Sequence, residues 1–285
     1  MIGITGASGP LGRVTAELVL QSADPREVVL TTRTPETLAD LAARGVLVRR
    51  ADFGDPRTLT AAFEGVERLL LISTDAIGAR LDQHRAAVSA AAEAGVSHLA
   101  YTSVPEPVAA NPALVVADHA GTEQALRESG LRWTMLRNNL YAHMQTSVIE
   151  QAIASGRLVT NQGNGAAAYV AREDCAAAAA AVLTRGGQEN KVMDITGPEP
   201  VSATDMVNLA REIGRRDIEL IHVNDQDFAA GLRAAGLPEP LTELVTSFGA
   251  SIRGGYLAHA DGAVSDLTGR EPRSFGDVVR ASIKS

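Results

Sequence analysis

Three glycines, Gly6, Gly9 and Gly12, follow an apolar run at the start of this chain and precede a helical pattern. A strand that enters such a turn and leaves it as a helix is typical of a dinucleotide-binding unit. Gly6 would let the chain turn sharply, Gly9 would let the backbone approach a pyrophosphate, and Gly12 would let the helix pack close to the strand. The helix N-terminus would offer unpaired N–H groups and a positive dipole end to phosphates. We therefore expect NAD or NADP at this turn.

The spacing of the turn, Gly-x-x-Gly-x-x-Gly, is the short-chain dehydrogenase variant rather than Gly-x-Gly-x-x-Gly. A turn that is rich in glycine for steric reasons alone is the alternative explanation. The strand before the turn and the helix after it favour cofactor binding instead. The residues expected to contact the cofactor here are Gly6, Ser8, Gly9, Pro10, Leu11 and Gly12.

The end of the expected second strand indicates which dinucleotide is bound. Enzymes that use NAD usually place Asp or Glu there, about 20 residues past the glycines, to bind the ribose 2′-hydroxyl. Residues 28–34 contain no carboxylate, and Arg33 stands at that place. A guanidinium suits a 2′-phosphate, to which it can donate two hydrogen bonds. We therefore expect NADPH (NADP) rather than NAD; a solvent-facing Arg33 is the alternative.

Apolar runs alternate with helical patterns through the first half of the chain. Buried parallel strands are expected at Ile2–Thr5, Val28–Thr31, Val46–Arg49, Arg68–Ser73, His98–Thr102 and Trp133–Leu136. Helices are expected at Leu11–Leu20, at Pro35–Ala43 with Thr34 as N-cap, and at Leu81–Ala94, which ends at Gly95. This alternation predicts an α/β fold of the Rossmann type, a doubly wound parallel sheet that binds ligands at the carboxyl ends of its strands.

The alternation loosens after about residue 138. Helices are expected at roughly 141–154, 173–184, 203–214, 225–235 and 239–252, and short strands near 157–160, 192–196 and 218–223. Ser202 and Asp205 suit a capping arrangement on the third of these helices. We expect residues 1–138, with later segments returning to them, to form the NADP-binding domain. Residues 139–285 are expected to form mainly a smaller C-terminal α/β lobe that binds the substrate.

Further cofactor contacts are expected where the strands end. The third strand is followed by residues placed to reach the adenine, the fourth ends near the nicotinamide ribose, and the fifth ends near the nicotinamide ring. The residues expected there are, in the same order, Asp52 and Phe53, then Ile72, Ser73 and Thr74, then Tyr101, Thr102 and Ser103. Asp52 and Phe53 suit ordinary loop positions equally well.

Composition excludes several classes of protein. The net charge of −8 disfavours nucleic-acid binding, and no pair of the six histidines has a metal-ligand spacing. The chain has no run of about 18 apolar residues and no signal peptide, so we expect a cytoplasmic protein without a membrane segment. The single cysteine, Cys175, excludes an intramolecular disulfide and is expected to be a small buried residue. The sequence leaves a homodimer open.

A common catalytic pair of dinucleotide-dependent reductases is missing. In Tyr-x-x-x-Lys, the lysine lowers the tyrosine pKa so that the tyrosine can act as a general acid. The residues four positions after the four tyrosines are Pro105, Gln145, Glu173 and Ala260, and none is lysine. Either the protein is not an enzyme, or its reaction does not need that acid.

The chain resembles the NmrA-like atypical short-chain dehydrogenases/reductases, most nearly the branch of NADPH-dependent quinone oxidoreductases of type 2 and triphenylmethane reductases. The resemblance spans nearly the full length and rests on Ile4–Gly12, Gln83–Arg85, Ala94–Val96, Ala100–Ser103, Leu136–Tyr141, Ala171–Asp174 and Gly236–Pro240. It implies hydride transfer from a nicotinamide to an electron-poor acceptor such as a quinone or a cationic dye. Such an acceptor needs no strong protein acid, and proximity and orientation do much of the work.

The resemblance also implies site residues. His119 and Glu123 match the family's His-x-x-x-Glu and share one helix face, so His119 is expected either to orient the substrate or relay a proton, or to be structural. Asn138 and Tyr141 follow the sixth strand and are expected to contact substrate or nicotinamide. The catalytic candidates are thus His119, Tyr141 and Asn138.

Three functions follow from this reasoning. The first is an NADPH-dependent reductase of a quinone or an aromatic carbonyl compound. The second is a ketoreductase that tailors a polycyclic aromatic polyketide in antibiotic biosynthesis, a class common in GC-rich genomes, at which the bias toward arginine (24 of 26 basic residues, 26 − 2 lysines) hints. The third, which the missing catalytic pair permits, is an NADP-sensing regulator without turnover.

Overall fold

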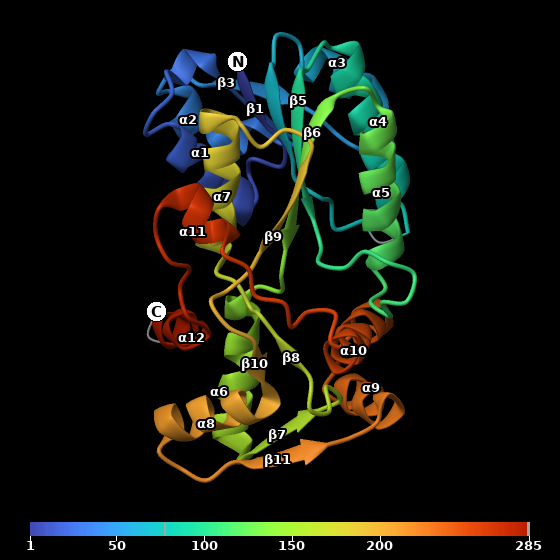
Figure 1. The fold of residues 1–285 in the computed structure, drawn as a ribbon, viewed down its shortest axis with the longest axis vertical. Helices are drawn as coiled ribbons and strands as arrows, with labels where there is room; N and C mark the ends of the chain where they lie inside the picture. The colour runs from blue at the N-terminus through green and yellow to red at the C-terminus, as the bar shows by residue number, and fades with distance from the viewer. Residues whose placement is uncertain (77, 284–285) are drawn as a thin grey trace.

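The computed structural model describes residues 1–76 and 78–283, and its larger part is a seven-stranded parallel sheet (Figure 1). In spatial order the strands are β3 (Leu47–Arg50), β2 (Val28–Thr32), β1 (Ile2–Ile4), β4 (Arg68–Leu71), β5 (His98–Ser103), β6 (Arg132–Asn138) and β9 (Lys191–Ile195). The order reverses direction between β1 and β4, and ligands of such sheets bind beyond the carboxyl ends of the strands at this reversal. The predicted doubly wound Rossmann sheet is confirmed.

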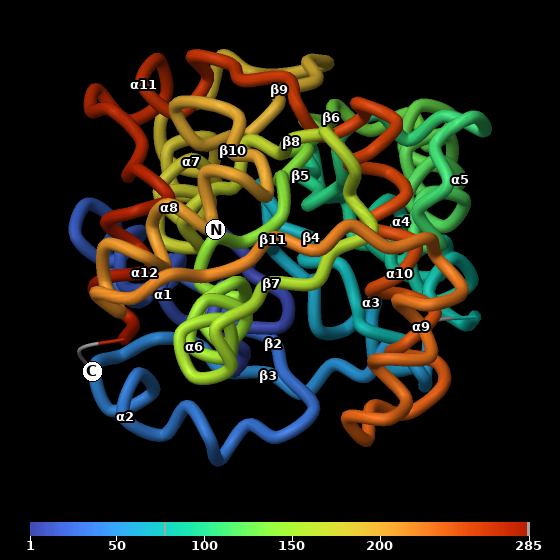
Figure 2. Tube along the Cα trace, turned by 90° about the horizontal axis from the view of Figure 1, so that it is seen from below, coloured from blue at the N-terminus to red at the C-terminus, as the bar shows by residue number. Residues whose placement is uncertain are grey.

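Helices cover both faces of the sheet, as Figure 2 shows from below. One face carries α1 (Pro10–Val19), α7 (Arg172–Arg185) and α11 (Ala263–Thr268), and the other carries α3 (Leu59–Ala62), α4 (Arg80–Glu93) and α5 (Val116–Glu128). Successive side chains of a strand point to opposite faces. Leu70 of β4 therefore packs in the core under α1 and α7, while Leu69 and Leu71 pack in the core under α3 and α4.

The alanine-rich stretch of α7 lies against α1. Its small side chains, including Ala176 and Ala178–Ala181, are buried, which lets the two helices approach closely. Cys175 is buried beside them, as expected, and burial raises the pKa of its thiol.

A smaller lobe lies beyond the carboxyl ends of the strands (Figure 1). Its helices are α6 (Thr146–Ser155), α8 (Ala203–Gly214), α9 (Asp225–Ala234), α10 (Glu239–Arg253) and α12 (Phe275–Ile283). β7 (Arg157–Thr160) pairs in parallel with β11 (Glu219–His222), and β8 (Ala166–Ala167) pairs antiparallel with β10 (Val201–Ser202). The lobe has a separate core. The chain leaves the sheet after β6 and returns through α7 and β9, so the lobe interrupts the larger unit; a boundary at residue 138 stays a prediction.

Several local predictions are confirmed and two are wrong. Ser202 and Asp205 form the expected capping box, and Gly95 has the positive φ of +79° that follows a helix end. The helix expected at Pro35–Ala43 is instead a 3-10 turn, η2 (Pro35–Leu38), followed by a short α2 (Ala39–Ala42), and Thr34 makes no side-chain cap. The helix expected at roughly 141–154 is confirmed, with a first 3-10 turn, η4 (Ala142–Gln145), that continues into α6.

The remaining short elements are the 3-10 turns η1 (Pro25–Glu27) and η3 (Pro56–Thr58). Among the described residues, no helix is both long and apolar enough to cross a membrane.

Candidate active site

The glycine turn lies between β1 and α1 at the carboxyl edge of the sheet. Gly6 has φ +58°, a conformation that favours glycine. A Cβ added to Gly12 would lie 2.4 Å from the carbonyl oxygen of Gly6 and 2.8 Å from Ala7 Cα, so only glycine lets the helix start this close to the strand. Gly9 is less restricted, because its added Cβ would come no nearer than 3.2 Å, to the same carbonyl.

The N-terminus of α1 is open to an anion. Pro10 is the first helical residue, the N-cap Gly9 makes no side-chain cap, and the first turn contains no acidic residue. Ser8 is exposed, and its hydroxyl is 2.8 Å from the Thr32 hydroxyl at the end of β2. Unpaired N–H groups and the helix dipole at this place suit a pyrophosphate. Pro10 is exposed with them, whereas the Leu11 side chain is in the core under α1.

Arginines flank the turn at the ends of β2 and β3. Arg33 is exposed and has no hydrogen bond or ion pair with any residue that the structure describes. Arg50 is also exposed and is the register partner of Thr32, so its backbone lies at the end of β2, one residue before Arg33. Sequence reasoning missed Arg50, because its position depends on the pairing of β2 with β3. Arg13, in contrast, is paired with Asp40 and is not a free cation.

Asp52 and Phe53 follow β3. One carboxylate oxygen of Asp52, Oδ1, accepts the Gly54 N–H at 2.9 Å, and the Asp52 N–H donates to the Thr58 hydroxyl at 2.9 Å. Phe53 is half-buried against the core under α3 and α4. Asp52 thus stabilises its own turn, and contact of either residue with an adenine stays a prediction.

The segment after β4 is held by three side chains, one that follows β1, one in β5 and one in α4. The N–H of Ile72 donates to the Thr5 hydroxyl at 2.9 Å, that of Ser73 to the Thr102 hydroxyl at 2.8 Å, and that of Thr74 to His84 Nε2 at 3.0 Å. The backbone of the expected ribose-binding segment is therefore fixed before any ligand arrives.

Behind this segment, Tyr101, His84 and His119 form a buried network. The Tyr101 hydroxyl is 2.7 Å from His119 Nδ1 and 3.3 Å from His84 Nδ1, and His84 Nδ1 is 3.0 Å from the Thr122 hydroxyl. Because His84 Nε2 accepts the Thr74 N–H, the neutral ring carries its proton on Nδ1. The Tyr101 hydroxyl then donates its hydrogen bond to His119 Nδ1, because His84 Nδ1 is a donor and cannot accept it.

This network shows how the side chains of Tyr101 and His119 are bound inside the protein. Tyr101 is fully buried and its hydroxyl points toward α4 and α5, so only its backbone is placed to contact a nicotinamide, and that contact stays a prediction. His119 is 4% exposed and its Nδ1 is satisfied by Tyr101 rather than by a backbone carbonyl, which favours an indirect role. Burial raises the pKa of Tyr101, which makes this hydroxyl a poor acid at neutral pH.

The two buried histidines should make stability depend on pH. Burial, together with the positive charge of Arg80, lowers the pKa of His84 and that of His119 from 6.5 to about 3. The other charged groups near them are Asp118 and Glu123. Between pH 6.5 and 3, the unfolded chain binds protons at both rings and the native protein does not. The free energy of unfolding therefore falls as the pH falls through this window, by about 1.4 kcal/mol per pH unit for each ring.

Urea unfolding at pH 5, 6 and 7 measures this slope. We expect His119→Gln to reduce the fall in unfolding free energy between pH 7 and pH 5 by about 2 kcal/mol, whatever its stability at pH 7. A slope equal to that of the parent protein would show that His119 binds protons equally in the native and unfolded states, which contradicts the lowered pKa.

Glu123 of α5 is a buried acceptor at the end of β5. It accepts a hydrogen bond from the Ser103 hydroxyl at 2.8 Å. It also pairs with Arg137 of β6, two nitrogens of which lie 3.0 and 2.9 Å from the two carboxylate oxygens, and with Arg127 at 3.0 Å. His119 and Glu123 share a helix, as expected, but the two side chains bind different partners. The Ser103 side chain, expected at the nicotinamide, is buried and oriented by this carboxylate.

Asn138 ends β6 and Tyr141 precedes η4, and two further residues that the sequence did not indicate, His143 and Arg172, lie beside Tyr141. The Tyr141 ring stacks on His143 with centroids 5.6 Å apart, and the Arg172 guanidinium lies 5.9 Å from the Tyr141 ring centre and donates to His143 Nε2. Asn138 Oδ1 is buried and has no hydrogen-bond partner among the described residues. Burial raises the pKa of Tyr141, and Asn138 and Arg172 oppose that shift. Polar groups from β6, η4 and α7 thus gather at one place.

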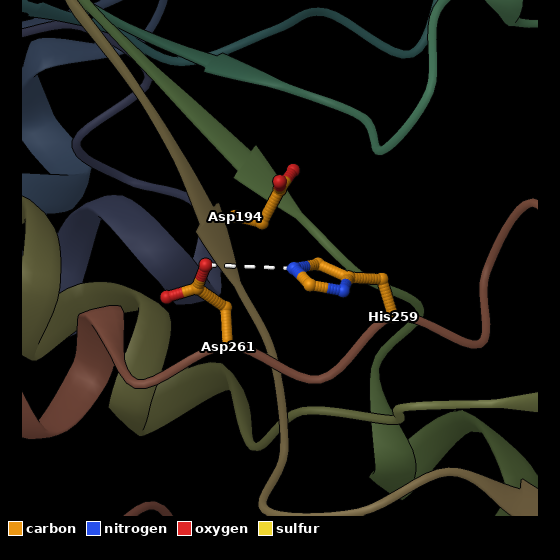
Figure 3. A group of neighbouring side chains, drawn as sticks. All are labelled: Asp194, His259 and Asp261. Atoms are coloured by element: carbon orange, nitrogen blue, oxygen red, sulfur yellow. Dashed lines mark ion pairs between the residues drawn. The ribbon is translucent and has the colours of Figure 1, made fainter.

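Asp194, His259 and Asp261 form a further polar group (Figure 3). His259 Nε2 lies 3.5 Å from Asp261 Oδ2, and Asp261 Oδ1 accepts the Ala263 N–H at 2.8 Å, near the start of α11. Asp194 is the register partner of Arg137; burial raises its pKa and Arg137 opposes the shift. A cation here would compete with this guanidinium. We interpret His259 and Asp261 as an exposed pair in which Asp261 also binds the backbone at the start of α11. The spacing of the histidines in the sequence did not indicate this group.

Comparisons with known proteins agree with this geometry. A family model described as NAD(P)H-binding matches residues 6–186. Quinone oxidoreductase 2 of Escherichia coli (strain K12) is 35% identical over 282 residues, which cover 98% of this chain and 97% of that protein. A (4-alkanoyl-5-oxo-2,5-dihydrofuran-3-yl)methyl phosphate reductase of Streptomyces griseus is 33% identical and covers 97% of this chain and 96% of its own length.

Two solved structures share the whole fold. The NADPH complex of the E. coli NADPH-dependent quinone oxidoreductase QOR2 superposes with a TM-score of 0.95 at 33% identity and covers 99% of this chain and 100% of that one. The Citrobacter sp. triphenylmethane reductase complexed with NADP(H) gives a TM-score of 0.91 at 30% identity, with the same 99% and 100% coverage.

Proposed function

This chain belongs to the NAD(P)H-binding family, in its NmrA-like branch, and from that premise we propose that it reduces a quinone or an aromatic carbonyl compound with NADPH. It is an NAD(P)H-dependent oxidoreductase. The observation that carries the proposal is the open glycine turn at the start of α1, with exposed arginines at the carboxyl ends of the neighbouring strands β2 and β3. The triphenylmethane reductase and the quinone oxidoreductase both act on electron-poor acceptors, which supports the substrate class.

The residues present fit an NADP cofactor. Gly12 leaves room that a Cβ would fill, the α1 N-terminus would bind the pyrophosphate, and Arg33 with Arg50 would bind the 2′-phosphate. Bound there, the reduced nicotinamide would supply a hydride. Ile72, Ser73 and Thr74 would lie along the ribose. The expected role of Ser103 is to stay fixed near the nicotinamide through Glu123.

The acceptor would be oriented by Asn138, Tyr141 and Arg172. Asn138 Oδ1 is a buried acceptor in need of a donor, and the Tyr141 hydroxyl and the Arg172 guanidinium are donors suited to a quinone oxygen. No lysine follows the tyrosines at the spacing of the common catalytic pair. The proton that completes reduction would therefore come from water or from a polar side chain, while orientation supplies most of the rate.

NADPH oxidation, followed at the absorbance of the reduced nicotinamide, tests the proposal. The acceptor panel contains simple quinones, a triarylmethane dye and polycyclic aromatic ketones, with NADH measured alongside. Turnover of the quinones or the dye is expected. Turnover of a polycyclic ketone alone would favour the second candidate, a biosynthetic ketoreductase, which the Streptomyces relative supports. Tight NADPH binding without any turnover would contradict an enzyme and favour a cofactor sensor.

Arg33→Glu tests the cofactor preference. The substitution replaces an exposed guanidinium by a carboxylate that repels a 2′-phosphate. We expect the KM for NADPH to rise by about 100-fold and the KM for NADH to change by less than about threefold, the difference being worth about 2–3 kcal/mol. Arg57→Glu, at an exposed arginine paired with Asp55 beyond β3, serves as a charge-matched control. Equal changes for the two cofactors would contradict the assignment of Arg33.

The setting of the reaction is also a proposal. A small aromatic or quinonoid substrate, a cytoplasmic location and no nucleic-acid partner are consistent with the acidic charge and the lone buried cysteine. A homodimer stays a prediction.

A further inference from the structure

Thr74 is held by α4 at every polar group it has. Its N–H donates to His84 Nε2 at 3.0 Å, its hydroxyl donates to Gln83 Oε1 at 2.9 Å, and its carbonyl accepts from Arg80 Nε at 2.6 Å. The three α4 residues lie within five positions of each other at the start of the helix. We name Arg80, Gln83 and His84 the α4 clamp. A residue outside regular structure that is bound this completely has one conformation available to it.

We propose that His84 is a positioning residue for the cofactor: through the α4 clamp it fixes the segment after β4 against which the nicotinamide half of NADPH binds. This rests on the proposed function, because Thr74 is taken to lie along the nicotinamide ribose. Ile72 and Ser73 are held by Thr5 and Thr102, which belong to or follow sheet strands. Thr74 is the first residue of the segment whose N–H depends on a helix, so His84 decides where the segment goes after it leaves the sheet.

The protonation of His84 follows from its partners. Nε2 has to be the acceptor for the Thr74 N–H, so the proton sits on Nδ1, which faces the Thr122 hydroxyl. Thr122 in turn donates to the Asp118 carbonyl at 2.7 Å, so its oxygen is available to accept from His84. Each hydrogen bond in the series from Thr74 through His84 and Thr122 to Asp118 then has one donor and one acceptor. Arg80 is itself 3.5 Å from Asp118, which ties the clamp to α5.

The site gains pre-organisation from this arrangement. If the segment were mobile in the free protein, NADPH binding would have to order it, and the affinity would fall by the fraction of time spent in the right conformation. A segment fixed in advance also keeps the nicotinamide at one distance from the acceptor, which affects kcat as well as binding.

His84→Leu removes the Nε2 acceptor with little loss of volume, whereas His84→Gln keeps an acceptor oxygen near the position of Nε2. His98→Leu is the matched control. His98 is equally buried and bonds the Thr134 hydroxyl through Nε2 at 2.8 Å, but it begins β5 at the opposite, amino edge of the sheet. His98→Leu loses one buried histidine hydrogen bond and His84→Leu loses those to Thr74 and Thr122, so both variants should be less stable than the parent, His84→Leu the more so.

Two measurements separate positioning from stability. Calorimetry should show the Kd for NADPH raised about tenfold in His84→Leu, with kcat lowered by a similar factor, and both restored to within about threefold of the parent in His84→Gln. His98→Leu should leave both unchanged. Hydrogen exchange of the Thr74 amide in the cofactor-free protein should be at least about tenfold faster in His84→Leu than in His98→Leu.

The exchange experiment does not depend on the proposed function. If the parent protein fails to bind NADPH, the proposed function is wrong, and the Thr74 amide still reports on the clamp. If NADPH binds and His84→Leu matches His98→Leu in affinity, turnover and amide exchange, the positioning role of His84 is wrong.

Discussion

Gly12→Ala is expected to lower the affinity for NADPH by roughly two orders of magnitude, equivalent to about 3 kcal/mol. The new Cβ would lie 2.4 Å from the Gly6 carbonyl oxygen and 2.8 Å from Ala7 Cα, and neither backbone atom can move without opening the glycine turn. Helix propensity alone would make the Gly12→Ala protein more stable, because alanine stabilises a helix interior by about 1 kcal/mol relative to glycine. The steric effect should win, since the clash is with backbone.

Gly231→Ala is the matched control. Gly231 lies inside α9, and an added Cβ there would meet nothing within 4 Å. This variant should be slightly more stable than the parent, by about 0.5–1 kcal/mol, with unchanged affinity. Calorimetric titration with NADPH and thermal unfolding with and without the cofactor measure both. A Gly12→Ala protein that binds NADPH within threefold of the parent would contradict the role given to this turn.

Glu123→Gln is expected to cost about 3–5 kcal/mol of the free energy of unfolding, the usual cost of breaking a buried ion pair on one side. Glu123 is 1% exposed and accepts hydrogen bonds from Arg137, Arg127 and the Ser103 hydroxyl. A neutral amide leaves Arg137, which is largely buried, without its principal anion. Ser103 loses a charged acceptor at the same time, so turnover should fall as well.

Glu128→Gln is the matched control, because it removes the same charge from an exposed glutamate of the same helix. Glu128 ends the same helix, is exposed and bonds only Gln124 among the described residues. Its substitution should change stability by no more than about 0.5 kcal/mol. Urea unfolding at pH 7 compares the two variants. Similar costs for both would mean that the Arg137 pair contributes little.

The parts of this fold that follow from short-range pattern were predictable. The glycine turn, the first six strands and the long helix α4 all carry local signals of period and punctuation. The stretch after Thr34 carries a helical pattern but no signal that it divides into η2 and a single turn of α2. The short pairs β8–β10 and β7–β11 went partly unpredicted for a similar reason: each joins segments that are far apart in the sequence.

The residues of the candidate site also divide into those that a local pattern places and those that only the folded structure places. Residues placed by the turn or by a strand end, such as Gly12 and Arg33, could be named from the sequence. Arg50 could not, because it becomes a neighbour of Arg33 only through the pairing of β2 with β3. Tyr101 was assigned to the right strand end, but the sequence does not state that its hydroxyl turns toward His119 and away from the edge.

The close packing of α1 on α7 has a consequence for synthesis of the chain. The inner side of α1, including Leu11, Ala16 and Val19, is buried in the same core as α7 and β9, all of which come after the interrupting lobe segment. A nascent chain that has emerged only through β6 can pack α1 on the sheet, but α1 still lacks α7 beside it. Contacts that are this distant in sequence form slowly and leave apolar surface open in the meantime. The cofactor turn, which leads into α1, therefore gains its full support only after α7 has been made.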